Sequence, residues 1–192
     1  MPVLDFDAIK DDYVSRIRPI AQNELLWFRN QPTLEAAVQL AATAVKSRGK
    51  RYSHQRRIKK DALRRARAVL SANTGRVQGC RDFLELIDLL DRLLAPIDGL
   101  GELYVYDTAL RVGAKLGIGP DKVYLHAGTR VGAKALGLDS RLATLEVSLL
   151  PLAWHGLAPH EIEDILCIYK EHLKGGKRIP PERSSSDRSW CS

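Results

Sequence analysis

Apolar residues recur along most of the chain at three- and four-residue spacing, the pattern typical of amphipathic α-helices. The clearest run covers residues 80–95, where Phe83, Ile87 and Leu90 fall on one line and further leucines lie beside them. Because this run is apolar nearly all round, we expect it to form a buried central helix. No stretch of useful length alternates apolar and polar residues as a strand would. The pattern therefore predicts an all-α protein of about eight helices.

The other expected helices are bounded by proline, glycine and small polar residues. In the first of them, Pro19 should kink or split the helix, because a proline in a helix interior removes a backbone donor and clashes with the preceding turn. In the last, Glu161, Glu163 and Asp164 should complement the dipole at the helix N-terminus. These helices are expected over residues 4–29, 34–48, 53–72, 102–116, 139–151 and 159–174.

Residues 1–174 are long enough to bury one core, so we expect a single helical domain. The composition changes at Gly175, after which proline, serine and arginine dominate as far as Ser192. Such a composition cannot bury enough apolar surface to order the backbone, so residues 175–192 are expected to be a disordered tail.

Charge changes this picture, because the net charge of +7 is concentrated in one segment. Residues 46–67 contain eleven Lys and Arg against Asp61 alone, which leaves the rest of the chain slightly acidic. Like charges on one helix face repel, so the basic helical segment 46–72 should have an acidic partner. Its apolar face lacks Trp and Phe, which argues against a membrane surface. The expected phosphate contacts are Lys50, Arg51, Arg56, Arg57, Lys59, Lys60 and Arg64.

A Gly99-Leu100-Gly101 triplet joins two helical patterns in the region 93–138 and predicts a short hairpin. Glycine takes positive φ without penalty, and the second glycine would expose N–H groups at a helix N-terminus, where an anion can bind. With Ile97 before it and Val105 after it, this stretch of about forty residues resembles the helix-hairpin-helix family of DNA-binding elements. The resemblance implies that Gly99 and Gly101 contact a nucleic-acid backbone.

The same region resembles, more distantly, the DNA glycosylase branch of that family. In that branch a lysine within the hairpin and an aspartate in a later loop perform the chemistry, and the matching positions here are Leu103 and Leu125. The resemblance therefore implies a non-catalytic protein that binds nucleic acid, with DNA favoured over RNA as the partner. In the later loop Tyr124, His126 and Arg130 could stack on a base and hold a phosphate. The alternative is that Tyr124 belongs to the core and His126 caps a helix.

Two other functions stay open at this point. The basic segment could dock an acidic protein partner, with the hairpin as an ordinary turn, or the chain could be a divergent glycosylase-like enzyme that acts through Asp107 or His126. A repeated Arg-Val-Gly-Ala-Lys sequence begins at Arg111 and again at Arg130. Both arginines are expected to be exposed on helices.

Cysteine and histidine spacing excludes several chemistries. Cys80, Cys167 and Cys191 are scattered, and no pair has the spacing of a zinc site, so we expect no metal and no cofactor. The first ten residues lack the pattern of a signal peptide, and no apolar run approaches the ~20 residues of a membrane span. We therefore expect a cytoplasmic protein without a membrane partner.

Overall fold

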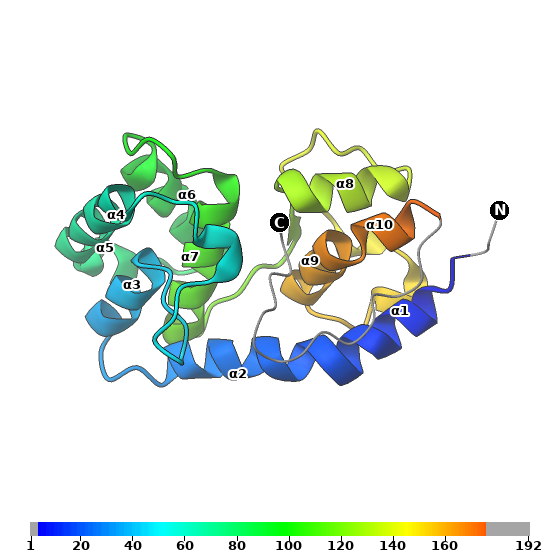
Figure 1. The fold of residues 1–192 in the computed structure, drawn as a ribbon, viewed down its shortest axis with the longest axis horizontal. Coiled ribbons are helices and arrows are strands. Elements are labelled where there is room, and N and C mark those ends of the chain that lie inside the picture. The colour runs from blue at the N-terminus through cyan, green and yellow to red at the C-terminus, as the bar shows by residue number, and fades with distance from the viewer. Residues whose placement is uncertain (1–3, 176–192) are drawn as a thin grey trace. The chain divides into compact units, whose positions relative to one another are not determined.

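The computed structural model describes residues 4–175 and confirms the all-α class (Figure 1). The chain forms two compact units where the sequence pattern predicted one domain. The first, here called the helical unit, is Gln22–Gly119. The second, the discontinuous unit, combines residues up to Ala21 with those from Pro120 on. The tail expected over 175–192 lies outside the described residues except for Gly175.

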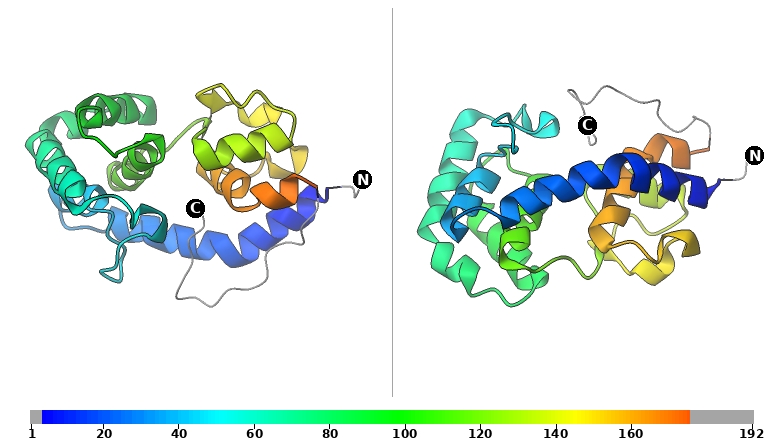
Figure 2. Two further views of the ribbon diagram at one scale, coloured as in Figure 1. Left: turned by 45° about the horizontal axis from the view of Figure 1, so that its top comes forward. Right: turned by 90° about the horizontal axis from the view of Figure 1, so that it is seen from below.

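Helix α7 (Glu102–Leu116) is the centre of the helical unit and packs against α3 (Leu34–Ala42) and α6 (Phe83–Leu94). Helix α4 (Lys60–Ala72) covers α3 and α6, and the short α5 (Thr74–Gln78) follows it, so that these helices lie side by side (Figure 2). The Tyr104 hydroxyl joins α7 to α3 by donating to the Ala42 carbonyl over 2.6 Å. Burial raises the pKa of this hydroxyl to about 12, so it stays protonated and keeps that bond.

The discontinuous unit is built around α8 (Ala127–Ala135), α9 (Pro159–Ile168) and α10 (Lys170–Leu173). Its core includes Trp154, Tyr169 and Ile162, all nearly fully buried. Trp154 also donates its indole N–H to the Phe6 carbonyl at the start of α1 (Phe6–Asp12), over 3.0 Å. Packing and hydrogen bonding thus tie the first helix of the chain to its last third.

A small antiparallel sheet replaces the helix expected over 139–151, so that prediction is wrong. Strand β1 (Val123–Tyr124) pairs with β2 (Thr144–Leu145), and 3-10 turns follow at Val147–Leu149 and Leu152–Trp154. The apolar residues in this stretch do have helical spacing. Pairing with β1 satisfies the backbone of β2 and buries Leu145, and that tertiary gain outweighs the local pattern.

The first helical run passes Pro19 without a break. A π-helical turn at Tyr13–Ile17 lies between α1 and α2 (Arg18–Arg29), and the Arg18 N–H bonds the Tyr13 carbonyl five residues earlier. The wider turn accommodates one extra residue, which relieves the crowding that a proline causes in a regular helix. Where a kink or a split was expected at Pro19, the structure therefore has a π turn just before this residue.

The three acidic residues at the start of α9 are bonded to other elements, so their function is not only to complement the helix dipole. All three lie within the first turns of α9, and two of them are buried. Their bonds fix the packing of α9, because each joins it to a segment distant in sequence. The pairs are Glu161 with Arg18, Glu163 with His126 and Asp164 with Tyr13.

Candidate nucleic-acid interface

The cationic segment, residues 46–67, begins in a tight loop of the helical unit. An antiparallel bridge joins Val45 to Arg51, and the Lys46 N–H donates to the Lys50 carbonyl over 2.8 Å. Gly49 turns the chain at the tip with a φ of +70°, a conformation that side chains disfavour. Backbone bonds therefore give this loop a fixed shape that holds its cations at the surface.

The helix expected over 53–72 starts later than predicted. A 3-10 turn forms at Ser53–Gln55, and α4 begins only at Lys60. Lys59 has a ψ of 139°, which is extended backbone, so α4 cannot continue toward the N-terminus. Several cations in a first helical turn would also oppose the helix dipole. Three cations that were expected on the helix lie instead in the connection between the 3-10 turn and α4: Arg56, Arg57 and Lys59.

Most of the cationic segment is exposed to solvent. Arg51 is half-buried and donates to the Ile58 carbonyl over 3.1 Å, and Arg64 pairs with Asp61 at the surface over 2.5 Å. Such an exposed pair contributes little to stability. In the cationic segment, five exposed cations form neither an ion pair nor a side-chain hydrogen bond with any described residue: Arg48, Lys50, Arg57, Lys59 and Lys60. The surface therefore carries a concentration of positive charge that the described part of the chain does not neutralise.

The exposed side of α4 borders the predicted hairpin. Arg65 donates to the carbonyl of Pro96, which lies between α6 and the Gly-Leu-Gly turn, over 3.4 Å. Arg67 donates to Gln39 on α3 over 2.7 Å. The hairpin and the cationic segment consequently belong to one continuous part of the helical unit.

The hairpin has one conformationally special glycine. Gly99 has a φ of +88°, whereas Gly101 has a φ of −98° and is the N-cap of α7. The turn therefore uses the conformational freedom of glycine at Gly99, whereas the backbone of Gly101 is one that any residue can adopt. Gly101 is exposed, and a β-carbon there would meet nothing within 4 Å. The exposed carboxylates Asp98 and Glu102 flank the turn and weaken it as an anion site.

The three candidate residues of the later loop lie in the discontinuous unit. His126 is 2% exposed, is the N-cap of α8 and bonds the Glu163 carboxylate through Nε2. Arg130 donates to the carbonyls of Ser140 and Leu142, each over 2.8 Å, and so braces the chain before β2. Tyr124 is half-buried in β1. These contacts favour the alternative in which the three residues hold the fold.

The repeated Arg-Val-Gly-Ala-Lys sequence occupies the C-terminal parts of α7 and α8, each followed by a glycine in the left-handed region. The expected exposure is wrong for Arg111, which is 5% exposed. Lys115 also has a structural contact, because its ammonium donates to the carbonyls of Arg29 and Gln31 at the end of α2.

A polar cluster in which Gln55 and Arg111 are buried and two further residues are half-buried explains the position of Arg111. Asp107 Oδ2 lies 2.6 Å from His54 Nε2, accepts from Gln55 Nε2 over 2.8 Å and accepts from Arg111 over 3.0 Å. Arg111 also donates to Gln55 Oε1 over 3.1 Å. We call these four residues the Asp107 cluster. The sequence suggested for Asp107 a role in a glycosylase-like enzyme, and its one signal of the cluster was an uncharged His-Gln pair within a run of cations.

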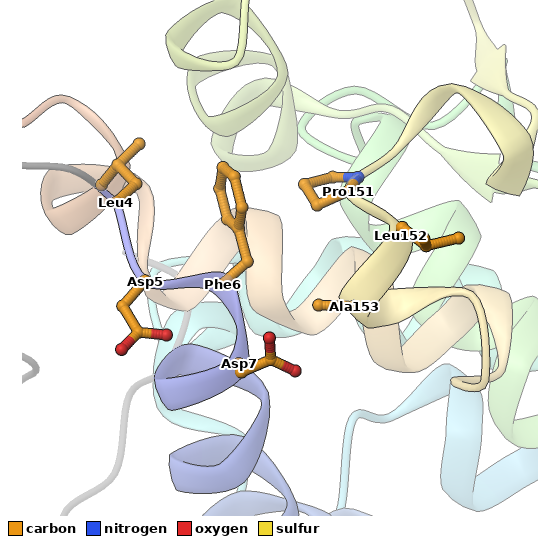
Figure 3. Close-up of a pocket in the computed structure, with 7 residues that line it drawn as sticks. All are labelled: Leu4, Asp5, Phe6, Asp7, Pro151, Leu152 and Ala153. Atoms are coloured by element: carbon orange, nitrogen blue, oxygen red, sulfur yellow. The ribbon is translucent and has the colours of Figure 1, made fainter.

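An apolar hollow of about 610 Å³ lies on the discontinuous unit, away from the cationic segment in sequence (Figure 3). Phe6 and Pro151 lie on opposite sides of it, and Leu152 beside it is 82% exposed. The two acids at its edge have local partners, since Asp5 caps α1 and Asp7 pairs with Lys10 over 3.3 Å. Both carboxylates are therefore held by the first turns of α1.

Comparison of the chain with known protein-family models, curated proteins and solved structures finds no match. Among residues 4–175, no three His, Cys, Asp or Glu side chains gather as a metal site would require. In the same residues, no helix combines the length and apolarity needed to cross a membrane.

Proposed function

We propose that the protein binds nucleic acid, with duplex DNA as the preferred form, through the phosphate backbone. The observation that carries this proposal is the set of five exposed cations, at positions 48–60, that form neither an ion pair nor a side-chain hydrogen bond with residues 4–175. A phosphate backbone is a regular array of negative charges, and a surface of this kind neutralises several of them at once.

The chemistry of the surface indicates what kind of binding to expect. Lys and Arg side chains that contact phosphates fix the position of a protein on nucleic acid but do not read its sequence. We therefore expect binding that depends strongly on salt and weakly on sequence. The hairpin adds a second contact at its exposed Gly101 backbone, smaller than that of the cationic segment because of the two flanking carboxylates.

The test is a salt series with labelled duplex DNA, single-stranded DNA and RNA, measured by fluorescence anisotropy. If about six phosphates are neutralised, the logarithm of affinity should fall against the logarithm of salt concentration with a slope of about −5. Replacing four cations by Gln should reduce the slope by roughly one unit for each phosphate that the variant no longer neutralises. The variant changes Lys50, Arg57, Lys59 and Lys60, which lack ion pairs and whose replacement should leave the fold intact.

A matched control separates a local site from general charge. It removes four exposed cations outside the segment, so that the net charge falls by the same amount. Affinity should fall much less than in the segment variant. Equal losses, or no binding by the parent protein to any of the three nucleic acids, would overturn the proposal. The control residues are Arg81, Arg92, Lys134 and Arg141.

A further inference from the structure

We infer that Asp107 is a positioning residue for this interface: with Glu24 it clamps the middle of the cationic segment and sets where its cations face. The inference rests on the proposed function. Neither carboxylate would touch the ligand, because each is engaged with side chains of the protein itself.

Asp107 on α7 holds the 3-10 turn Ser53–Gln55 from one side. Its Oδ2 atom is within hydrogen-bonding distance of both His54 and Gln55, and Gln55 is 2% exposed. Arg111, one helical turn later, bonds both the carboxylate and Gln55, so the three side chains close a ring of contacts. Buried charged groups in such a ring are held firmly, because each would be costly to leave unsatisfied.

Glu24 on α2 holds the preceding part of the segment. Its Oε1 accepts from the Ser47 hydroxyl over 2.5 Å, and its Oε2 accepts from the Ser47 N–H over 3.2 Å and from the Tyr52 hydroxyl over 3.1 Å. The Arg111 guanidinium carbon lies 3.8 Å from the centre of the Tyr52 ring. This stacking connects the two carboxylates through Tyr52 and Arg111.

The order of these residues along the chain gives the clamp its significance. Besides Ser47, the anchored residues are Tyr52, His54 and Gln55. These three separate two groups of cations, at 46–51 and at 56–60. The two groups repel one another, and without an anchor the turn between them would relax. The segment would then have to become ordered on binding, which costs free energy and lowers affinity, and a preorganised segment avoids this cost.

The discriminating experiment is Asp107→Asn, because electrostatics and positioning predict opposite results. The substitution removes a negative charge near the cationic segment, so charge alone would strengthen DNA binding. Positioning predicts that affinity falls by about tenfold, with the salt slope unchanged because every cation is still present. The matched control is Asp61→Asn, which removes an exposed negative charge within the same segment and should bind as tightly as the parent or more tightly.

Amide hydrogen exchange supplies a readout that does not depend on nucleic acid. In Asp107→Asn, residues 44–59 should exchange faster while α6 keeps its protection. Tyr52→Phe, which removes only the bond to Glu24, gives a milder variant in case Asp107→Asn fails to fold, and it should show a smaller change in the same direction.

The outcomes separate this inference from the proposed function. If the parent binds no nucleic acid, the proposed function fails, and faster exchange at 44–59 would still establish the clamp. If the parent binds and the exchange of 44–59 accelerates while affinity is unchanged or improved, Asp107 does not position the interface. If exchange does not change in either variant, the clamp itself is refuted.

Discussion

Arg18 and Glu161 form a two-point ion pair, with 2.6 Å between Nε and Oε1 and 3.0 Å between the second guanidinium nitrogen and Oε2. Glu161 Oε2 also accepts from the Ala158 N–H over 2.9 Å, at the start of α9. The Glu161 side chain is 7% exposed, so water cannot easily replace these bonds. One carboxylate thereby both caps α9 and attaches it to α2.

The first prediction concerns this pair. Glu161→Gln should lower the free energy of unfolding by about 1–3 kcal/mol, because the bonds lose their charge and Arg18 loses its partner. Urea denaturation would measure the change. Glu171→Gln is the control, since Glu171 pairs with Lys174 at the surface and its replacement should cost less than about 0.5 kcal/mol. Equal losses of unfolding free energy in the two variants would show that the Arg18–Glu161 pair stabilises the protein no more than an exposed ion pair does.

The hairpin glycines should respond differently to alanine. Gly99→Ala places a β-carbon on backbone with a φ of +88° and should destabilise by about 1–2 kcal/mol. Gly101→Ala should be close to neutral, because its backbone is extended and the space around it is open. Thermal unfolding would compare the two. If Gly101 also touches a phosphate, its alanine variant should lose DNA affinity while its stability is unchanged.

Glycines inside the repeated sequence should be required for packing. A β-carbon at Gly113 would lie 2.6 Å from the Ile118 carbonyl oxygen, and one at Gly132 would overlap the Leu166 carbonyl on α9. Backbone atoms cannot move aside as a side chain can, so each alanine variant should destabilise by more than about 2 kcal/mol. Gly75→Ala is the control: its site in α5 is open, and stability should rise by about 0.5–1 kcal/mol. Chemical denaturation of the three variants tests this.

A half-buried histidine in the first turn of α9 should make stability depend on pH. Burial lowers the pKa of His160 below its ordinary value of 6.5; the nearby Glu161 carboxylate opposes this shift, and Arg18 adds to it. Below pH 6.5 the unfolded chain therefore binds a proton that the folded protein does not, so stability falls as pH decreases through this window and is regained as pH rises. His160→Gln should lose less stability than the parent between about pH 7.5 and about pH 5.5 in urea titrations. An equal loss in both proteins would assign the effect to other groups.

The helical part of the fold was predictable because its signals are local. The apolar run before Ala95 and the proline that opens α9 both specify helices through short-range spacing and end chemistry. The strand of Thr144–Leu145 was not, because its stability comes from pairing with residues about twenty positions earlier. The division into two units also depends on such distant contacts, which a periodic pattern does not encode.

The candidate site was only partly predictable for a similar reason. Charge is a property of the sequence, so the concentration of cations in residues 46–67 was visible, but which of them lie on a helix was not. Arg111 and Asp107 occupy one face of α7, where nothing in their spacing distinguishes a solvent-exposed ion pair from a buried one. Their partner, Gln55, is more than fifty residues away, and only the fold brings it close.

The loop at the beginning of the cationic segment has a practical consequence for handling the protein. Its base is closed by the Val45–Arg51 bridge, and its tip at Gly49 is exposed with nothing within 4 Å of a β-carbon there. Exposed tips that are closed by backbone bonds tolerate insertions well. A short peptide tag or a single labelling cysteine inserted at the tip would therefore place a probe inside the cationic segment, while the neighbouring helices keep their packing.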